Sequence, residues 1–326
     1  MKKIPAASSI LSAEHLNLFA RALYALSSQS AARLLKAGIN HSYLIEDGAA
    51  RYIFRIYSLN WRTRDEISEE LRFIDHLYRA GVQVSYPIAD ANGNYIQTVG
   101  APEGDRLAVM FSYAPGNKLQ NFSADVHEQI GELMGRIHLK AEDFVLDRIT
   151  YSARVLLVES LESVKKFLPA DSDEMTFLFA TQQELLHAFR SVNTGNLRKG
   201  AVHLDIWFDN LNISPEQGIT LFDFDFCGNG WLCLDIAYYL MQLFVLEPDE
   251  KEYILKKDSF LKGYERMVKI HDEERRILPM LGICLHYFYL GIQCRRFENW
   301  SNVFLNEVYL KRYVAVRIRK FVSAIS

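Results

Sequence analysis

The first third of the chain shows two kinds of hydrophobic pattern. Short apolar runs bounded by turn residues predict β-strands, and apolar residues three and four positions apart predict two helices. One helix begins after Ser12, and the other ends before Gly81, a residue type common just past a helix end. The predicted strands span residues 32–36, 43–46, 52–57 and 107–111, and the first three are expected to form a meander.

The pattern changes near residue 115. The apolar strand at 107–111 runs into Ala114-Pro115-Gly116, and such a breaker after a buried strand indicates a boundary. We therefore expect one domain over residues 1–115 and a second, mainly helical domain over residues 116–326. Helices are predicted there at 123–140, over 151–199 with a turn at 169–171, and at 249–271, 273–297 and 303–324.

Composition and charge exclude several classes of protein. Of the 326 residues, 49% are hydrophobic and 24% are charged, which are ordinary values for a globular protein. A net charge of −3 gives no electrostatic basis for binding nucleic acid or an anionic membrane. The N-terminal residues lack the apolar core of a signal peptide, and the four cysteines form no CxxC pair. We therefore expect a cytoplasmic protein with reduced, buried thiols.

Three features of the second domain have competing interpretations. Residues 277–294 hold no Lys, Arg, Asp or Glu, but they include Pro279, so a buried helix is preferred over a membrane span. His138 lies on the apolar side of a predicted helix and is interpreted as a core histidine rather than a catalytic one. The basic residues of the last predicted helix spread around it, so we expect them at the surface. They are Lys311, Arg312, Arg317, Arg319 and Lys320.

The segment 201–240 carries most of the candidate chemistry. The turn at 214–218 places Asn210 and Asp223 at the same end of a predicted hairpin, where their side-chain oxygens would suit Mg²⁺. Asp205 would lie beside the metal, where a carboxylate can accept the proton of an attacking hydroxyl. The competing interpretation is a pair of strands with solvated acids at their ends. The short strands predicted here span 201–202, 211–213 and 219–222.

Asp225 is a further candidate metal ligand. It follows Asp223 by two residues, and on a continuing strand the two side chains would share one face. It would then either bind a second ion or support the loop, and the sequence leaves both open.

The spacing His-x-Asp-x₄-Asn, followed by a strand that ends in Asp, is typical of the catalytic and metal loops of kinase-like phosphotransferases. The segments VHLDIWFDNLNI and ITLFDFDFCGNGWLCLDIAYYL resemble the superfamily of aminoglycoside phosphotransferases, choline kinases and homoserine kinases. The resemblance implies an α+β, two-lobed protein-kinase-like fold. Its N-terminal lobe would hold an antiparallel sheet plus a helix, and its C-terminal lobe would be mostly helical.

By position, the resemblance makes Asp205 the catalytic base and makes Asn210 and Asp223 the Mg²⁺ ligands. His203 and Asp235 would hold the backbone of the catalytic loop. These assignments are carried over residue by residue from the family's H-G-D-x₄-N and G-x₄-D-L-A patterns.

Leu204 departs from the family pattern, which mostly has Gly at this position. If the loop needs a positive φ there, a Leu is costly. The loop would then differ in shape, or activity would be reduced.

In the first domain the resemblance implies a nucleotide-binding lobe. The turn after the first strand resembles the family's phosphate-binding loop through Gly38 and Asn40. Arg55 matches the basic residue that grips the α- and β-phosphates of the nucleotide. Backbone groups from Phe111 to Tyr113 would hydrogen-bond the adenine.

A glutamate on the helix at 63–80 would pair with Arg55. Glu70, in the context EELRFIDHL, matches the family's glutamate, and Glu69 is the competing choice.

The implied function is ATP-dependent phosphoryl transfer, with Mg²⁺, to a hydroxyl of a small metabolite that is homoserine-, choline- or sugar-like. Trp207, Phe208 and Trp231 form either a cation–π box for a choline-like group or ordinary packing. Two alternatives stay open. RIYSLNWRTRDEISEELRF resembles the bacterial stress-response Ser/Thr kinase. Leu204 for Gly and Arg55 for Lys would also be compatible with a nucleotide-binding pseudokinase that regulates a partner.

Overall fold

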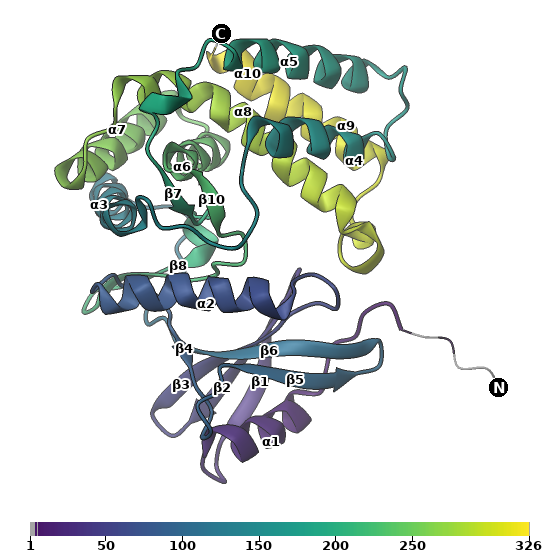
Figure 1. Cartoon of the computed structure of the whole chain (residues 1–326), viewed down its shortest axis with the longest axis vertical. Coiled ribbons are helices and arrows are strands. Elements are labelled where there is room, and N and C mark those ends of the chain that lie inside the picture. Colours follow the sequence, from purple (N-terminus) through teal and green to yellow (C-terminus); the bar gives the residue numbers. More distant parts are fainter. Residues whose placement is uncertain (1–3, 5, 326) are drawn as a thin grey trace. The chain divides into compact units, whose positions relative to one another are not determined.

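The structure, a computed structural model, describes residue 4 and residues 6–325. The chain forms two compact units. The N-terminal unit holds the chain up to Pro115 together with Glu298–Trp300, and the C-terminal unit holds Gly116–Phe297 and the chain from Ser301 onward. The predicted α+β fold, with an N-terminal antiparallel sheet and a helical C-terminal part, is confirmed (Figure 1).

The N-terminal unit is built on an antiparallel sheet of order β1-β2-β3-β6-β4, in which β5 also pairs with β6. The predicted meander is its first half, and in register Tyr43 lies opposite Phe54 and His41 lies opposite Ile56. The strands are β1 (Ala31–Ala37), β2 (His41–Asp47), β3 (Ala50–Ile56), β4 (Pro87–Ile88), β5 (Ile96–Ala101) and β6 (Gly104–Ser112).

Two helices complete this unit, and both begin as the sequence predicts. The side chain of Ser12 accepts a hydrogen bond from the first turn of α1, and Leu16 of that helix packs into the sheet core. Thr63 and Glu66 form a capping box at the start of α2, and the chain leaves that helix through Gly81 at φ +79°. The helices are α1 (Ala13–Tyr24) and α2 (Arg64–Arg79).

The C-terminal unit consists of helices around two small antiparallel sheets, β7 with β10 and β8 with β9 (Figure 1). The helices are α3 (Ala124–Ala141), α4 (Ser160–Val164), α5 (Asp173–Phe189), α6 (Cys233–Leu246), α7 (Glu250–Met267), α8 (Asp272–Arg295), α9 (Glu307–Tyr313) and α10 (Lys320–Ile325). The strands are β7 (Lys199–Val202), β8 (Leu211–Ser214), β9 (Gly218–Leu221) and β10 (Gly228–Trp231).

Close backbone contact between α3 and α7 depends on glycine. A Cβ atom on Gly131 would lie 2.0 Å from the carbonyl oxygen of Phe260, and one on Gly263 would lie 1.9 Å from the carbonyl oxygen of Glu128. Any larger residue at either position would therefore push the two helices apart.

The helix predicted over 151–199 ends earlier than expected. After α5 the chain makes turns, in which the side chain of Asn193 accepts a hydrogen bond from Gly195 N–H, and β7 begins at Lys199. Small and polar residues favour such local side-chain-to-backbone bonds over a continuing helix. The last helix is also not uniform, because the π-helical segment η6 (Val314–Arg319) lies between α9 and α10.

α8 contains the apolar run that was compared with a membrane span. By length and composition α8 could cross a membrane, yet 78% of its most apolar window is buried inside the protein. This burial fits the prediction of a core helix. The four cysteines are also buried, and none is in a disulfide.

Candidate catalytic site

The catalytic-loop residues lie between β7 and β8. The short 3₁₀ turn η3 (Phe208–Asn210) leads into β8, where Leu211 pairs with Leu221 of β9. Phe222 N–H donates to the carbonyl of Asn210 at 3.1 Å, which places Asn210 at the same hairpin end as Asp223. The predicted placement of these two residues is therefore confirmed.

Asn210 holds Asp205 in place. Its side-chain Nδ2 donates to the backbone carbonyl of Asp205 at 2.9 Å and to the carboxylate Oδ2 at 2.8 Å. An amide has one oxygen acceptor besides its donor nitrogen, so Oδ1 of Asn210 is the atom left for a cation. Asn210 is buried and Asp205 is half-buried, so the pair is shielded without being sealed off.

Two tyrosines that the sequence did not reveal lie beside the other carboxylate oxygen of Asp205. The hydroxyl of Tyr238 on α6 donates to Oδ1, and the hydroxyl of Tyr289 on α8 contacts the same oxygen at 3.4 Å. Burial, followed by the negative charge of Asp205, raises the pKa of both hydroxyls well above the ordinary tyrosine value. Both therefore stay protonated as hydrogen-bond donors at neutral pH.

Asp235, at the start of α6, fixes the backbone of the loop. Its Oδ2 accepts from His203 N–H at 2.9 Å, and its Oδ1 accepts from Leu204 N–H at 2.6 Å. Leu204 has φ +64°, so the positive φ that the sequence raised as a condition is present with a Leu in place. The carbonyl of Leu204 accepts from the Tyr289 hydroxyl at 2.5 Å, so both its backbone groups are bonded.

His203 connects the loop to the segment that carries Asp223. Its Nδ1 accepts from Asp205 N–H at 3.1 Å, so its Nε2 carries the proton and donates to the carbonyl of Phe222 at 3.3 Å. The geometry is that of a scaffold residue, the role that the resemblance implied.

A buried chain of hydrogen bonds supports Asp235 from behind. His138 Nε2 lies 3.2 Å from Asp235 Oδ2, and its Nδ1 lies 2.7 Å from the Tyr264 hydroxyl. Arg198 donates to that hydroxyl at 3.1 Å and pairs with Glu274 at 2.7 Å. His138 is thus a fully buried, satisfied core histidine, as predicted.

Asp225 does not lie where the sequence placed it. The expectation of a shared face required β9 to continue through both acids, but the strand ends at Leu221. Asp223 then adopts φ +67°, which turns the chain and ends the strand alternation. Asp225 is buried in the following turn, where its carbonyl accepts from Arg148 Nη2 at 2.6 Å, so the shared-face argument for a second metal ligand is wrong.

The oxygen ligands available near the loop are few. Within the described part of the chain no three His, Cys, Asp or Glu side chains gather as a metal cluster. Asn210 and Asp223 offer one amide oxygen and one carboxylate, hard ligands of the type that Mg²⁺ takes in small number. The donor chemistry therefore fits the ion that the resemblance implies.

In the N-terminal unit, Arg55 pairs with Glu70, as predicted. Arg55 Nη1 lies 3.4 Å from Glu70 Oε1, and both side chains are buried. The competing residue, Glu69, instead forms an ion pair with Arg72 at 2.7 Å. The Tyr57 hydroxyl also donates to Glu70, at 3.1 Å.

The predicted nucleotide contacts of the N-terminal unit lie on the same sheet. Gly38 N–H donates to the carbonyl of Asn40 at 3.1 Å, so it closes the turn itself, and Asn40 Oδ1 accepts from Ser58 N–H. Phe111 is buried under Arg55, with 5.5 Å from the guanidinium carbon to the ring centre, and Tyr113 follows β6. Their roles toward a nucleotide stay predictions.

The aromatic residues around the loop divide into two groups. Trp231 stacks on Phe189 with ring centres 5.7 Å apart, which is packing. Trp207 and Phe208 instead line a hollow of about 240 Å³ in the C-terminal unit. Gln242 also lines it, and that side chain donates to the Tyr238 hydroxyl, which bonds Asp205.

Comparison with known proteins finds several similar kinases. A homoserine kinase from Methylobacillus glycogenes is 25% identical over 253 residues, which are 77% of this chain and 76% of that protein. A solved amicoumacin kinase in complex with AMP-PNP and Ca²⁺ has a similar fold, with a TM-score of 0.76 at 22% identity over 94% of this chain and 93% of that one. A microcompartment-associated aminopropanol kinase also gives 0.76, at 20% identity over 95% and 98%.

The sequence model of the phosphotransferase enzyme family matches residues 31–270, a range that includes the sheet and the whole catalytic loop. The resemblance seen in the loop motifs is therefore confirmed. The chain belongs to the phosphotransferase enzyme family of small-molecule kinases.

Proposed function

We propose that this kinase transfers the γ-phosphate of ATP to a hydroxyl of a small metabolite, with Asp205 as the base. The observation that carries the proposal is the way Asn210 holds Asp205, through both its carboxylate and its backbone carbonyl. A carboxylate fixed in this way is placed to orient a hydroxyl and take its proton, and phosphoryl transfer depends mostly on such positioning.

Mg²⁺ fits the remaining oxygen atoms. Asn210 and Asp223 would hold the ion, which when bound would neutralise negative charge on the phosphates. In the N-terminal unit, Arg55 is the residue proposed to grip those phosphates, because a guanidinium offers paired donors to phosphate oxygens. Glu70 would set the orientation of Arg55 through their ion pair.

Tyr238 and Tyr289 are positioning residues in this proposal. Tyr238 donates to one carboxylate oxygen of Asp205 and Asn210 donates to the other, while Tyr289 donates to the neighbouring carbonyl of Leu204. Since the raised pKa keeps both hydroxyls protonated, neither competes with Asp205 for the proton of the acceptor.

The hollow beside the loop supports a small acceptor. At about 240 Å³ it is below the range of pockets that hold drug-sized ligands, which begins near roughly 300 Å³. Its lining mixes the aromatic rings of Trp207 and Phe208 with polar groups such as Gln242. Homoserine and aminopropanol, named for two of the similar kinases, have a suitable size.

A screen of ADP release tests the proposal. The wild type is assayed with Mg-ATP over homoserine, amino alcohols, choline, sugars and aminoglycosides, and turnover is expected on a small hydroxylated compound. Asp205→Asn should then lower kcat by about 10²–10⁴-fold, the usual contribution of a general base. Asp209→Asn is the matched control, because it makes the same charge change in the same loop but its partner is Lys118.

Two results would contradict the proposal. Near-normal turnover by Asp205→Asn would show that Asp205 is not the base. A thermal shift with Mg-ATP but no turnover on any acceptor would instead identify a nucleotide-binding regulator.

A further inference from the structure

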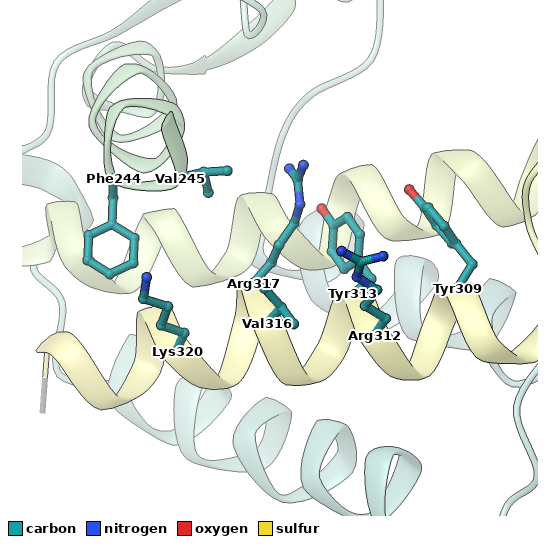
Figure 2. A pocket seen from close by; sticks show the side chains of 8 residues that line it. All are labelled: Phe244, Val245, Tyr309, Arg312, Tyr313, Val316, Arg317 and Lys320. Carbon is teal, nitrogen blue, oxygen red and sulfur yellow. The ribbon is translucent and has the colours of Figure 1, made fainter. Parts of the chain in front are cut away.

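The last helix of the C-terminal unit lines a second hollow, of about 340 Å³, against the end of α6 (Figure 2). Three of the residues around it are cationic, and none is acidic. Phe244 and Val245 come from α6, and the others come from α9, η6 and α10. Those others are Tyr309, Arg312, Tyr313, Val316, Arg317 and Lys320.

The π-helical segment explains why the sequence did not show this cluster. In an α-helix, residues five apart such as Arg312 and Arg317 point about 140° away from each other. η6 lies between α9 and α10 as a wider turn with hydrogen bonds from residue i to residue i+5, which brings such residues toward one face. Figure 2 shows Arg317 and Lys320 rising from the same side of this helix toward α6. Arg312, Arg317 and Lys320 are exposed, as predicted, but they gather around one hollow instead of spreading around the helix.

The remaining two basic residues are already engaged elsewhere. Lys311 forms an ion pair with Glu307 at 2.9 Å, and Arg319 donates to the carbonyl of Asp173. Arg312, Arg317 and Lys320, by contrast, have no carboxylate within ion-pair distance in the part of the chain that the structure describes. The positive charge around the hollow is thus uncompensated.

Aromatic rings form the apolar part of the lining. The Arg317 guanidinium lies 5.4 Å from the Tyr313 ring centre, and the Lys320 ammonium lies 5.7 Å from that of Phe244. Behind Tyr313 the fully buried His286 has no hydrogen-bond partner on either ring nitrogen. Burial, together with the nearby charge of Arg317, lowers the pKa of His286 to about 3, so this imidazole is neutral at neutral pH and adds no charge of its own.

We propose that this hollow binds a small phosphomonoester whose apolar or planar body lies against the aromatic rings. Two guanidinium groups and an ammonium match a doubly charged phosphate better than a single carboxylate, and arginine binds phosphate through paired donors. The volume suits a small metabolite. Val245 lies seven residues beyond Tyr238, about 10 Å along α6, so the hollow is separate from the Asp205 site and does not rest on the proposed reaction.

Calorimetric titration of the full chain with phenyl phosphate at low salt tests the proposal. Arg312→Gln/Arg317→Gln should weaken binding by about tenfold or more, because it removes two charge-assisted contacts. Lys311→Gln/Arg319→Gln is the matched control, since it removes the same charge from the same helix outside the hollow, and it should bind within about twofold of wild type. Phenol should not bind, and inorganic phosphate should bind more weakly than the ester.

Three outcomes would overturn the proposal. They are no binding of phenyl phosphate by the wild type at millimolar concentration, no loss in the hollow variant, and an equal loss in the control. Circular dichroism checks that each variant is folded. If the double variant does not fold, Lys320→Gln replaces it, with the same direction of effect and a smaller amplitude.

Discussion

Leu204 combines a fully buried side chain with a left-handed backbone. Replacing it by a smaller residue loses buried apolar contacts, whereas replacing it by glycine also relieves backbone strain. A buried leucine replaced by alanine loses about 2–5 kcal/mol of unfolding free energy. A non-glycine residue at positive φ costs about 1–2 kcal/mol, which only glycine recovers. Replacing Leu204 by the family's usual Gly would therefore relieve strain and still lower stability.

Comparing Leu204→Gly with Leu204→Ala separates the strain from the burial. At an ordinary buried site Gly is less stable than Ala by about 1.5 kcal/mol, from the freer unfolded chain and the lost methyl group. The strain at Leu204 offsets this difference, so we expect the two variants to lie within about 0.5 kcal/mol of each other. Leu211 is the matched control, because it is also fully buried and begins β8 at φ −125°.

The measurement is urea unfolding followed by far-UV circular dichroism, whose signal comes largely from the helices of the unit that contains Leu204. Both variants should have midpoints below wild type, by about 1 M or more at a typical slope of about 1–3 kcal/mol per molar urea. The Ala-to-Gly step should be small at Leu204 and large at Leu211. An equal Ala-to-Gly difference in stability at both positions would show that the backbone at Leu204 is not strained. Wild-type stability in Leu204→Ala would show that burial of the leucine side chain does not stabilise the protein.

Three further predictions concern single side chains. Tyr289→Phe should lower kcat on the identified acceptor by about ten- to a hundredfold with little change in KM, because the buried carbonyl of Leu204, beside Asp205, loses its hydrogen-bond donor. Tyr287→Phe, whose hydroxyl donates to the Leu178 carbonyl, should not do so in the same ADP-release assay. Glu70→Gln should lower the free energy of urea unfolding by about 3–5 kcal/mol by leaving Arg55 charged and buried. The same change at the half-buried Glu69, whose partner Arg72 is exposed, should cost less than about 1 kcal/mol, and equal losses would contradict the buried pair. His286 has a lowered pKa of about 3 in the folded state, so between this value and its ordinary value of 6.5 only the unfolded chain binds the proton. The free energy of unfolding therefore decreases as the pH is lowered through this range. His286→Phe should therefore reduce the acid slope of the unfolding free energy by about 1.4 kcal/mol per pH unit between about pH 6 and pH 4, and an unchanged slope would exclude this titration.

The parts of the site that the sequence predicted are those fixed by short-range spacing. Asn210 and Asp223 flank a hairpin whose turn and strand lengths can be read from local residues, so their placement follows from the chain itself. Arg55 and Glu70 lie on a strand and on the next helix, and the burial of Glu70 on the apolar side of α2 selects it over Glu69. In both cases the regular backbone between the two residues is enough to predict that they lie close together.

The tyrosines that hold Asp205 could not be predicted in this way. Tyr238 and Tyr289 belong to helices that are apolar on most sides, so no stripe of polar residues indicates which face meets the loop. Their partner is distant in sequence, and only the packing of α6 against α8 brings the two rings to 5.2 Å from each other. A tyrosine in an apolar helix has the same sequence signature whether its hydroxyl bonds a carboxylate, as that of Tyr238 does, or a backbone carbonyl, as that of Tyr287 does.

The two wrong predictions have a common physical cause. A period of 2.0 or 3.6 residues assigns faces correctly only while the backbone keeps that period, and a single irregular residue changes the face of everything that follows. The left-handed Asp223 ends the strand alternation and separates Asp225 from it, while the wider turn of η6 brings Arg312 toward Arg317. Such irregular backbone is unfavourable locally and persists only where surrounding contacts hold it. Because those contacts come from distant segments, the positions that depart from the period are the ones that sequence reasoning misses, and in this chain they lie beside the catalytic loop and around the cationic hollow.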